Sequence, residues 1–334
     1  MLTSTPALML RIDLSTRSSS IGEIPENVIR RYLGGRGLGS YLLYENVPAH
    51  VDPLGSENRL FFTAGPLSGT RFYYSSKANL TTKSPLTGIY LYSICSGRLA
   101  EEMRKAGLWA IEIAGVATFP TYLIINDQDV DFRDASGIWG LETAAAQSRM
   151  LGHTPPDSAA AVGIGPAGEE LVPSAALFSG VDQYRCFGRG GAGSVMGSKR
   201  LKGFVVMGSG SVEAVHEEKL RSARKGILTK LRTTAREWAA TWRRYETAAD
   251  LETTNELGMI PTRNWQTGQF EAWRAIDKST TPMGWPTKVR PCGRAARTVP
   301  RPAPGMSKSP KAHMQAHVAT WSGRQSTRSA RNAG

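Results

Sequence analysis

Short stretches of alternating apolar and polar residues run through the first two thirds of the chain, and this period of two predicts β-strands. Leu10–Leu14 shows the alternation clearly, whereas Leu60–Ala64 is a continuous apolar run typical of a fully buried strand. Glycine and proline clusters separate such runs and predict turns. Further strands are predicted at residues 20–24, 89–93, 109–113, 121–125, 130–132 and 204–207, and helices at residues 25–33, 98–106 and 141–151.

Glycine-rich stretches between these elements predict loops. Residues 35–39, 163–168 and 184–199 each combine several glycines with neighbouring polar residues. Residues 77–88 are expected to be extended and polar, and residues 179–187 are a poor strand by their composition.

The pattern changes to a helical one after a Gly/Ser linker at residues 209–212. From His216 to Tyr245, apolar residues recur at roughly helical spacing. After Cys292 the chain has almost no large apolar residues, so it cannot bury enough surface to offset its conformational entropy. We therefore expect an α+β fold: a strand-rich N-terminal domain of packed sheets with short helices (residues 1–208), the start of an α-helical domain (213–292) and a disordered basic tail (293–334).

The 334 residues carry a formal net charge of +13, which is concentrated in two segments. Residues 219–244 hold nine Lys and Arg against one Glu, and residues 293–334 hold eight and no acidic residue. Basic segments of this kind can bind nucleic acid or an anionic membrane surface. The more ordinary interpretation of residues 219–244 is a docked helix with one solvated face, which makes nucleic acid an unfavoured partner.

Composition also indicates the compartment. The sequence has no run of eighteen apolar residues, and Ala7–Leu10 is too short for the apolar core of a signal peptide. Its three cysteines lie far apart and do not form a disulfide framework. These features predict a cytoplasmic protein without a membrane span.

The stretch from Tyr184 to Lys199 is the strongest chemical signal. It sets five glycines among arginines and lysines, and backbone N–H groups exposed by glycine, with fixed cations beside them, suit an anionic or phosphorylated ligand. A tight turn with solvated cations is the alternative. Gly188-x-Gly190-x-x-Gly193 also matches the dinucleotide fingerprint, but the flanking strand and full helix which that motif needs are weak here, so a nucleotide-dependent enzyme is disfavoured.

Several motifs in a fixed order resemble the tungsten-containing aldehyde:ferredoxin oxidoreductase family. Each motif is modest alone, whereas the ordered set is highly specific. The matching stretches are residues 32–38, 52–58, 65–70, 82–88, 164–169, 188–202 and 264–268. The resemblance implies that the first domain is the base on which a bis-pterin tungsten cofactor lies, with molybdenum as the alternative metal.

The same resemblance implies particular cofactor contacts. By position they fall on Lys77, on the turn formed by Ile94, Cys95, Ser96 and Gly97, and on the later turn that contains Arg185, Cys186, Gly188 and Arg189. Some family members carry Arg where Lys77 stands and Asn where Ile94 stands. We interpret Cys95 and Cys186 as small loop residues rather than metal ligands.

Family members also bind a 4Fe–4S cluster through a Cys-x-x-Cys-x-x-x-Cys run and a distant fourth cysteine. By resemblance Cys292 is the first ligand of that run, but Ala295 and Val299 occupy the next two positions and no cysteine follows. A four-thiolate cluster is therefore not completable in this chain. We expect residues 1–292 to be the opening of a longer enzyme and residues 293–334 to be read in a wrong frame; a genuine short protein with a basic tail is the alternative.

In the complete family enzyme, an aldehyde and water give a carboxylic acid, and two electrons pass through tungsten and the iron–sulfur cluster to ferredoxin. The expected function is therefore that of an oxidoreductase, with this chain as an inactive N-terminal fragment. The implied partners are an aldehyde or related small molecule and ferredoxin, and a homodimer is compatible with the resemblance. A nucleic-acid or membrane-surface binder that uses residues 219–244 and the tail is the alternative function.

Overall fold

The computed structural model describes residues 6–70, 72–155, 158–181, 185–245 and 249–277, apart from the side chains of residues 243 and 244. The chain divides into two compact units, one that extends to Arg224 and one that begins at Lys225. Cys292 and the predicted disordered tail lie outside the described residues.

Two six-stranded sheets form the first unit. The first sheet has the order β2-β1-β6-β3-β4-β5 and the second has the order β11-β10-β9-β12-β7-β8. The strands of the first sheet are β1 (Leu8–Asp13), β2 (Ser18–Glu23), β3 (Leu60–Ala64), β4 (Lys77–Lys83), β5 (Tyr90–Ser96) and β6 (Leu108–Ala114). Those of the second are β7 (Thr121–Asn126), β8 (Asp129–Asp134), β9 (Ala160–Gly163), β10 (Leu177–Ser179), β11 (Arg185–Phe187) and β12 (Leu201–Met207).

The second sheet repeats the topology of the first with every strand number raised by six. In each sheet one pair is parallel, β1 with β6 and β7 with β12, and all other neighbouring pairs are antiparallel. The helices follow the same plan, because α3 (Leu99–Lys105) joins β5 to β6 and α6 (Ala192–Ser198) joins β11 to β12. The first unit is therefore an internal structural repeat.

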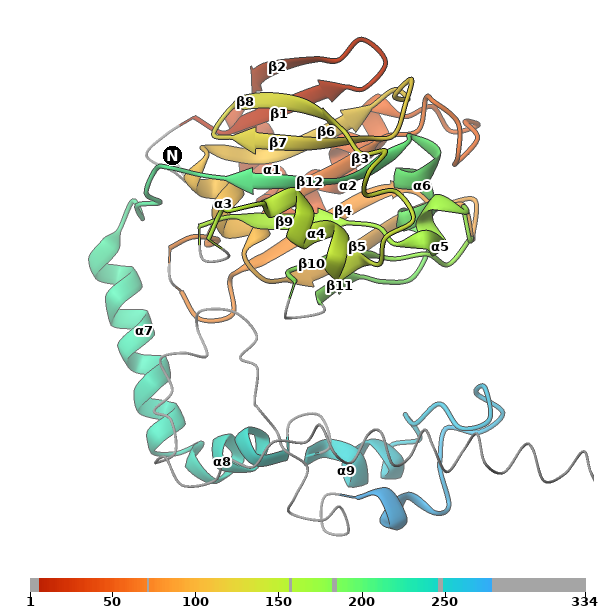
Figure 1. Ribbon diagram of the computed structural model, residues 1–334. Coiled ribbons are helices and arrows are strands. Elements are labelled where there is room, and N and C mark those ends of the chain that lie inside the picture. The colour runs from red at the N-terminus through yellow and green to blue at the C-terminus, as the bar shows by residue number, and fades with distance from the viewer. Residues whose placement is uncertain (1–5, 71, 156–157, 182–184, 246–248, 278–334) are drawn as a thin grey trace, which may run out of the picture. The chain divides into compact units, whose positions relative to one another are not determined.

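The main core lies between the two sheets (Figure 1). Phe62 of the first sheet contacts both Phe187 and Phe204 of the second in edge-to-face geometry, with ring centroids 5.7 and 4.8 Å apart. Helices α3 and α6 also place apolar side chains in this core, including Met103 and Val195. Burial of large aromatic surface of this kind is a dominant contribution to the stability of the unit.

Helices cover the outer faces of both sheets. On the first sheet, α1 (Glu26–Tyr32) and α2 (Gly35–Asn46) pack over a second apolar cluster centred on Phe61 and Trp109. On the second sheet, α4 (Thr143–Leu151) packs over a third cluster that includes Met150 and Val205. The short helix α5 (Pro166–Glu169) packs against α6. This confirms the predicted α+β class and its packed sheets.

Several local predictions were wrong, including the loop predicted at residues 163–168, which contains most of α5. Gly35–Gly39 is the first turn and a half of α2 rather than a loop, because Gly39 packs so closely on β4 that a Cβ there would lie 2.4 Å from Oγ1 of Thr81. Ile94, Cys95 and Ser96 belong to β5 rather than to a turn. The weakly patterned segment 179–187 contains the end of β10 and all of β11, which pair with each other.

The second unit is helical in its described part. Helix α7 (Glu217–Arg232) contains the boundary between the units, and α8 (Arg236–Tyr245), α9 (Leu251–Glu256) and the short 3-10 helix η2 (Trp273–Ile276) follow. Thr262 and Thr267 form an isolated antiparallel bridge in an otherwise irregular segment. None of the helices among the described residues combines the length and the apolarity that crossing a bilayer requires.

Candidate functional site

The end of β5 and the start of β4 form the first half of the candidate site. Lys77 and Ser96 are cross-strand partners, and Nζ of Lys77 donates a hydrogen bond of 3.3 Å to Oγ of Ser96. The amide of Gly97 donates to the carbonyl of Ser76 at 3.3 Å, and the hydroxyl of Ser76 donates back to the carbonyl of Gly97. Gly97 has φ +133°, a conformation that favours glycine.

The glycine-rich turn after β11 forms the second half and packs directly on β5. Ser93 donates a hydrogen bond of 2.9 Å to the carbonyl of Gly188. Ser84, which follows β4, donates a hydrogen bond of 2.6 Å to the carbonyl of Gly190. The two halves also meet at Gly97, where a Cβ would lie 4.0 Å from Cγ of Arg185. The edge strands of the two sheets thus place both predicted cofactor turns side by side.

The two turns are equivalent positions in the internal repeat. One follows β5 and precedes α3, and the other follows β11 and precedes α6. Gly97 is the first residue after β5, and Gly188 is the first residue after β11. The site is therefore a pair of matching strand–turn–helix corners contributed by one chain.

Positive charge gathers at these turns. Lys77 and Arg189 are exposed and Arg185 is half-buried. Within the described residues, neither Lys77 nor Arg189 forms an ion pair with a carboxylate. Arg189 has φ +63°, a backbone conformation that non-glycine residues adopt rarely. Such an arrangement suits an anion held by cations and backbone donors.

The exposed face of β5 is apolar and aromatic. Tyr90, Tyr92 and Ile94 alternate with buried residues along this strand, and Ile94 is 47% exposed. The guanidinium of Arg36 lies over the ring of Tyr92, with 4.8 Å between Cζ and the ring centroid. This face can support a flat ring system by contact and by stacking. The side chain of Ile94 offers no hydrogen bond to a ligand on this face.

Two free cysteines lie within the site. Cys95 is buried in β5, and Cys186 is exposed in β11. Desolvation by burial raises the pKa of the Cys95 thiol to about 12, and the nearby Cys186 adds to the rise, whereas Arg185 and Lys77 oppose it. In the part of the chain that the structure describes, no cluster of three or more His, Cys, Asp or Glu residues is arranged to bind a metal ion.

Lys199, which ends the glycine-rich stretch, and Lys202, which follows it, are not available to a ligand, contrary to the sequence interpretation. Lys199 is fully buried, and its ammonium donates to the carbonyls of Ser56 and Gly115 at 3.4 and 3.2 Å. Lys202 is also fully buried and pairs with Glu169. Both ammonium groups are held inside the fold, and the cations left at the turn are Arg185 and Arg189.

The dinucleotide-binding interpretation is also excluded by topology. A Rossmann unit needs two parallel strands joined by a helix. Between β11 and β12 lie β10 and β9, and each of the three neighbouring pairs is antiparallel. The β11 and β12 strands therefore run in opposite directions, and Gly188-x-Gly190-x-x-Gly193 does not belong to a parallel βαβ unit.

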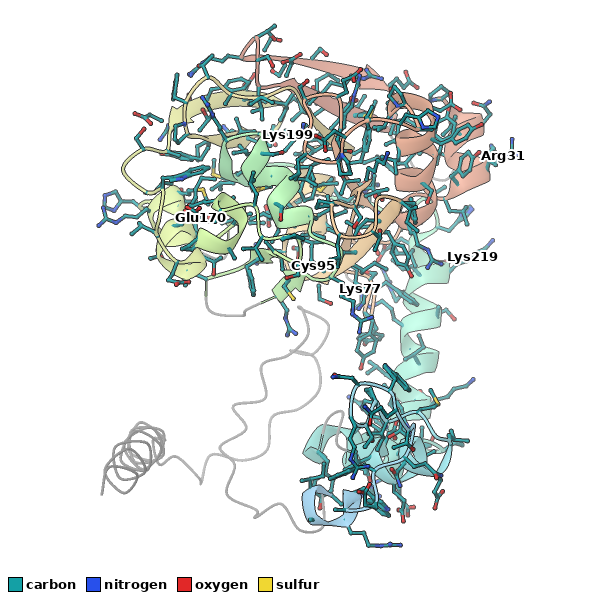
Figure 2. The ribbon with its side chains drawn as sticks, turned by 90° about the vertical axis from the view of Figure 1, so that its right-hand side faces the viewer. Arg31, Lys77, Cys95, Glu170, Lys199 and Lys219 are labelled. Atoms are coloured by element: carbon teal, nitrogen blue, oxygen red, sulfur yellow. The ribbon has the colours of Figure 1, made fainter. Side chains whose placement is uncertain are left out.

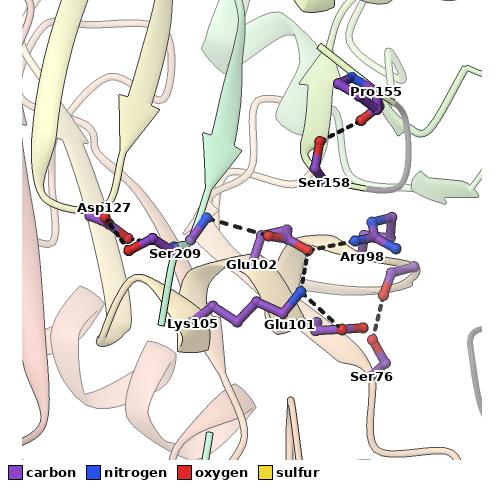
Figure 3. Close-up of polar contacts among 11 residues, drawn as sticks. Ser76, Arg98, Glu101, Glu102, Lys105, Asp127, Pro155, Ser158 and Ser209 are labelled. Carbon is purple, nitrogen blue, oxygen red and sulfur yellow. Dashed lines mark hydrogen bonds and ion pairs between the residues drawn. The ribbon is translucent and has the colours of Figure 1, made fainter. Parts of the chain in front are cut away.

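A buried carboxylate that the sequence analysis missed fixes the helix of the first corner. Glu102 is 1% exposed and accepts hydrogen bonds from Arg98 at 2.7 Å and Lys105 at 2.9 Å (Figure 3). Its second oxygen accepts the amide of Gly208, just after β12, at 3.3 Å. Glu102 thus ties the helix after the first turn to the end of the domain's last strand. The sequence shows only a charged pair at helical spacing, which does not reveal burial.

Residues 9–208 match the family model described as aldehyde ferredoxin oxidoreductase, N-terminal domain. The chain is 37% identical over 261 residues to a tungsten-containing aldehyde ferredoxin oxidoreductase from Pyrococcus furiosus. It is 40% identical over 265 residues to a protein of the same description from Thermococcus kodakarensis. Each match covers 78% of this chain and 43% of the relative, so the chain spans less than half the length of these relatives.

One solved structure has a similar fold over much of this chain. The active site complex BamBC of benzoyl coenzyme A reductase, in complex with 1,5-dienoyl-CoA, superimposes with a TM-score of 0.65 at 30% sequence identity. That match covers 68% of this chain and 34% of the solved chain. Similar folds therefore occur in proteins whose descriptions differ.

Proposed function

Because the chain belongs to the aldehyde ferredoxin oxidoreductase family, we propose that its first unit binds a tungstopterin cofactor and forms the base of an enzyme that oxidises an aldehyde to a carboxylic acid. The observation that carries this proposal is the pairing of two equivalent cationic turns by the internal repeat. A bis-pterin cofactor has two similar halves, each with a phosphate and a hydrogen-bonding ring, and two similar turns match it.

The residues at the turns fit such a group. The cations Lys77, Arg185 and Arg189 would hold the phosphates, since charged donors form the strongest hydrogen bonds to phosphate oxygens. Gly97 and Gly188 leave their backbone open to close approach by a ligand, and the hydroxyl of Ser96 adds a polar contact. Ile94 and Cys186 would flank the ring systems.

When bound, the metal and its pterin ligands supply the two-electron chemistry, while the protein supplies orientation and electrostatics. In this chain Lys77 and Arg185 bring positive charge to the site from two different sheets. The exposed face of β5 excludes water from one side of a bound ring. Tungsten is the metal named for the relatives, and the choice between tungsten and molybdenum here belongs to the proposal.

Electron transfer to ferredoxin requires more than the described site. The sequence contains three cysteines, Cys95, Cys186 and Cys292, and a four-thiolate cluster needs four. We keep Cys292 as the proposed first ligand of a 4Fe–4S cluster. We expect this chain alone not to assemble the cluster and therefore not to reduce a dye in the presence of an aldehyde. Cytoplasmic location and a homodimer stay predictions.

The alternative of a nucleic-acid or membrane-surface binder rests on the basic block 219–244. Most of this block forms α7 and α8, and none of the α7 residues is buried. Most of the charged side chains of α7 are exposed, which does not identify a partner. Binding to DNA or anionic vesicles that weakens steeply with salt would support this alternative.

Cofactor content tests the main proposal directly. The chain is produced with tungstate in a host that makes molybdopterin, and bound tungsten and pterin are measured by mass spectrometry and by pterin fluorescence after oxidation. We expect both in the wild type and at least a severalfold loss in the triple variant K77A/R185A/R189A. The matched control R149A/K219A/K225A removes three exposed cations elsewhere and is expected to keep the wild-type content.

Two results would contradict the proposal. One is a folded wild-type chain that contains no pterin under these conditions. The other is an equal loss in the triple variant and in the control, because general surface charge would then explain the binding.

A further inference from the structure

The chain segments that form the two halves of the site run antiparallel to each other with a fixed register. Ser93 bonds to Gly188, and Leu91 packs against Gly190, so a step of two residues forward in β5 matches a step of two residues back after β11. The elements β5 and β11 are also in contact. The register therefore extends into the two strands themselves.

Continuing this register by one further step places Cys95 opposite Cys186. The side chain of Arg185, the residue next to Cys186, lies near Gly97, where a Cβ would be 4.0 Å from its Cγ, so the two segments stay close beyond this pair. The two cysteines are also close enough to interact electrostatically, since Cys186 contributes to the raised pKa of Cys95. Figure 2 shows Cys95 at the same edge of the first unit as Lys77.

The internal repeat explains why the register pairs these two residues. Cys95 lies two residues before Gly97 in the first corner, and Cys186 lies two residues before Gly188 in the second. Equivalent residues of two matching units meet only near the axis that relates the units. The cysteine pair therefore marks the point where the two sheets approach each other at the candidate site.

The environments of the two thiols differ and set an order of reaction. Cys186 is exposed, so a dissolved oxidant reaches it first. Cys95 is 4% exposed, and its thiol donates to the carbonyl of Ser96 at 3.3 Å. Its raised pKa keeps it protonated near neutral pH, where a thiol is a poor nucleophile.

We propose that Cys95 and Cys186 are a redox modification site whose thiols join into a disulfide on reaction with small-molecule disulfides such as oxidised glutathione. The thiolate of Cys186 attacks one sulfur of the small disulfide, which releases one small thiol and leaves a mixed disulfide on Cys186. Cys95 then loses its proton to solvent and attacks Sγ of Cys186, which releases the second small thiol. In sum, two protein thiols are oxidised and one small disulfide is reduced to two thiols.

The disulfide would join β5 of the first sheet to β11 of the second between the two turns. The cross-link would fix the spacing of the two halves of the site and would remove the side chain of Cys186 from its exposed position. The inference stands apart from the proposed function, since it requires no bound cofactor.

Peptide mapping of the full chain tests the inference. The C292S variant, which retains only the two cysteines of the pair, is incubated with oxidised glutathione, alkylated under denaturing conditions and digested with trypsin. We expect residues 84–98 joined to residues 186–189 by a disulfide. Glutathione bound to Cys186 with an alkylated, unoxidised Cys95 would overturn the proposal, as would a cross-link that forms no faster in the folded chain than in denaturant.

Two variants and a pH series separate the steps. C95S is expected to stop at the mixed disulfide on Cys186, and C186S is expected to remain unmodified because Cys95 is not accessible. Closure of the mixed disulfide should accelerate up to about tenfold per pH unit between about pH 7 and about pH 9, as the thiolate fraction of Cys95 rises. Lys77 and Arg185 face Cys95 and favour its thiolate, whereas Cys186 opposes it. A closure rate independent of pH would contradict this geometry.

Discussion

Gly190 lies so close to Leu91 that a Cβ on the glycine would be 1.6 Å from Cδ1 of the leucine. Gly190 also has φ +65°, which disfavours any side chain. We therefore expect Gly190→Ala to lower the free energy of unfolding by about 2–4 kcal/mol, through a steric clash added to backbone strain. Urea unfolding monitored by tryptophan fluorescence measures the change.

The control for that prediction is Gly88→Ala. Gly88 has φ +73° but no atom within 4 Å of the position of a Cβ, so only the backbone term applies and the expected loss is about 1 kcal/mol. Equal losses in the two variants would show that the contact between the glycine turn and β5 is not tight.

The buried ion pair of Lys202 and Glu169 supports the second sheet. The two side chains are 0% and 3% exposed, and Lys202 also donates to the carbonyl of Leu141 at 2.8 Å. Glu169→Gln leaves a buried ammonium without its counter-charge, so we expect a loss of about 3–5 kcal/mol in the free energy of unfolding.

A surface pair provides the comparison for this variant. Arg133 and Asp131 are 52% and 56% exposed, and Asp131→Asn is expected to cost less than about 1 kcal/mol. The two variants are compared by urea unfolding at the same salt concentration. If Glu169→Gln were as mild as Asp131→Asn, the pair would not be desolvated in solution.

Lys199 gives the unfolding free energy a specific pH dependence. Burial lowers the pKa of Lys199 to about 8, Arg59 adds to the decrease and Asp13 opposes it. The unfolded chain, with a lysine pKa of about 10.4, binds more protons than the folded chain above about pH 8. Below about pH 8 the folded chain carries the full penalty of the buried charge. The unfolding free energy rises as the pH increases from about 8 toward about 10.5, because the folded chain loses this proton before the unfolded chain does.

The variant Lys199→Met measures this dependence by difference. We expect the unfolding free energy of the wild type to rise relative to that of the variant by at most about 1.4 kcal/mol per pH unit between about pH 8 and about pH 10. Other titrating groups are shared and cancel in the difference. A constant difference between the two proteins across this range would show that the pKa is not lowered.

Glu102 is expected to control local opening of the first corner. Glu102→Ala removes the acceptor for Arg98, Lys105 and the amide of Gly208. Hydrogen exchange followed by mass spectrometry should show at least severalfold faster exchange in α3 and at Gly208. The exposed Glu170→Ala serves as the control, and faster exchange there as well would contradict a specific role for Glu102.

The sequence predicted elements best where burial was uniform. Leu60–Ala64 is a strand with the predicted bounds. Five consecutive buried residues fit a strand that is covered on both faces of its sheet. Gly35–Gly39 was predicted as a loop because glycine lowers helix propensity. The helix forms there because small residues allow α2 to approach β4 closely, and such tertiary contacts are invisible in the local pattern.

The candidate site shows the same division. The sequence singled out the residues of both halves of the candidate site, although it took the end of β5 for a turn, and the structure brings the two halves together. The sequence could not distinguish Arg185 and Arg189, which remain at the turn, from Lys199 and Lys202, whose charges are buried. All four are cations in one basic stretch, and the local pattern does not show which of them are buried. Burial of Glu102 and the register that opposes Cys95 to Cys186 depend on contacts between distant segments. The proposed cofactor contacts stay predictions.

The repeat of the two sheets has a thermodynamic consequence for any ligand with two similar halves. The matching corners come from different residues of one polypeptide, so each can diverge without a matching change in the other. Here the first corner offers Lys77, Ser96 and the apolar Ile94, and the second offers Arg185 and Arg189. Two half-sites with unequal affinities bind the two halves of a ligand one after the other. Binding of the first half then raises the effective concentration of the second half at its own half-site. The asymmetry thus gives a direction to ligand assembly that two identical corners would lack.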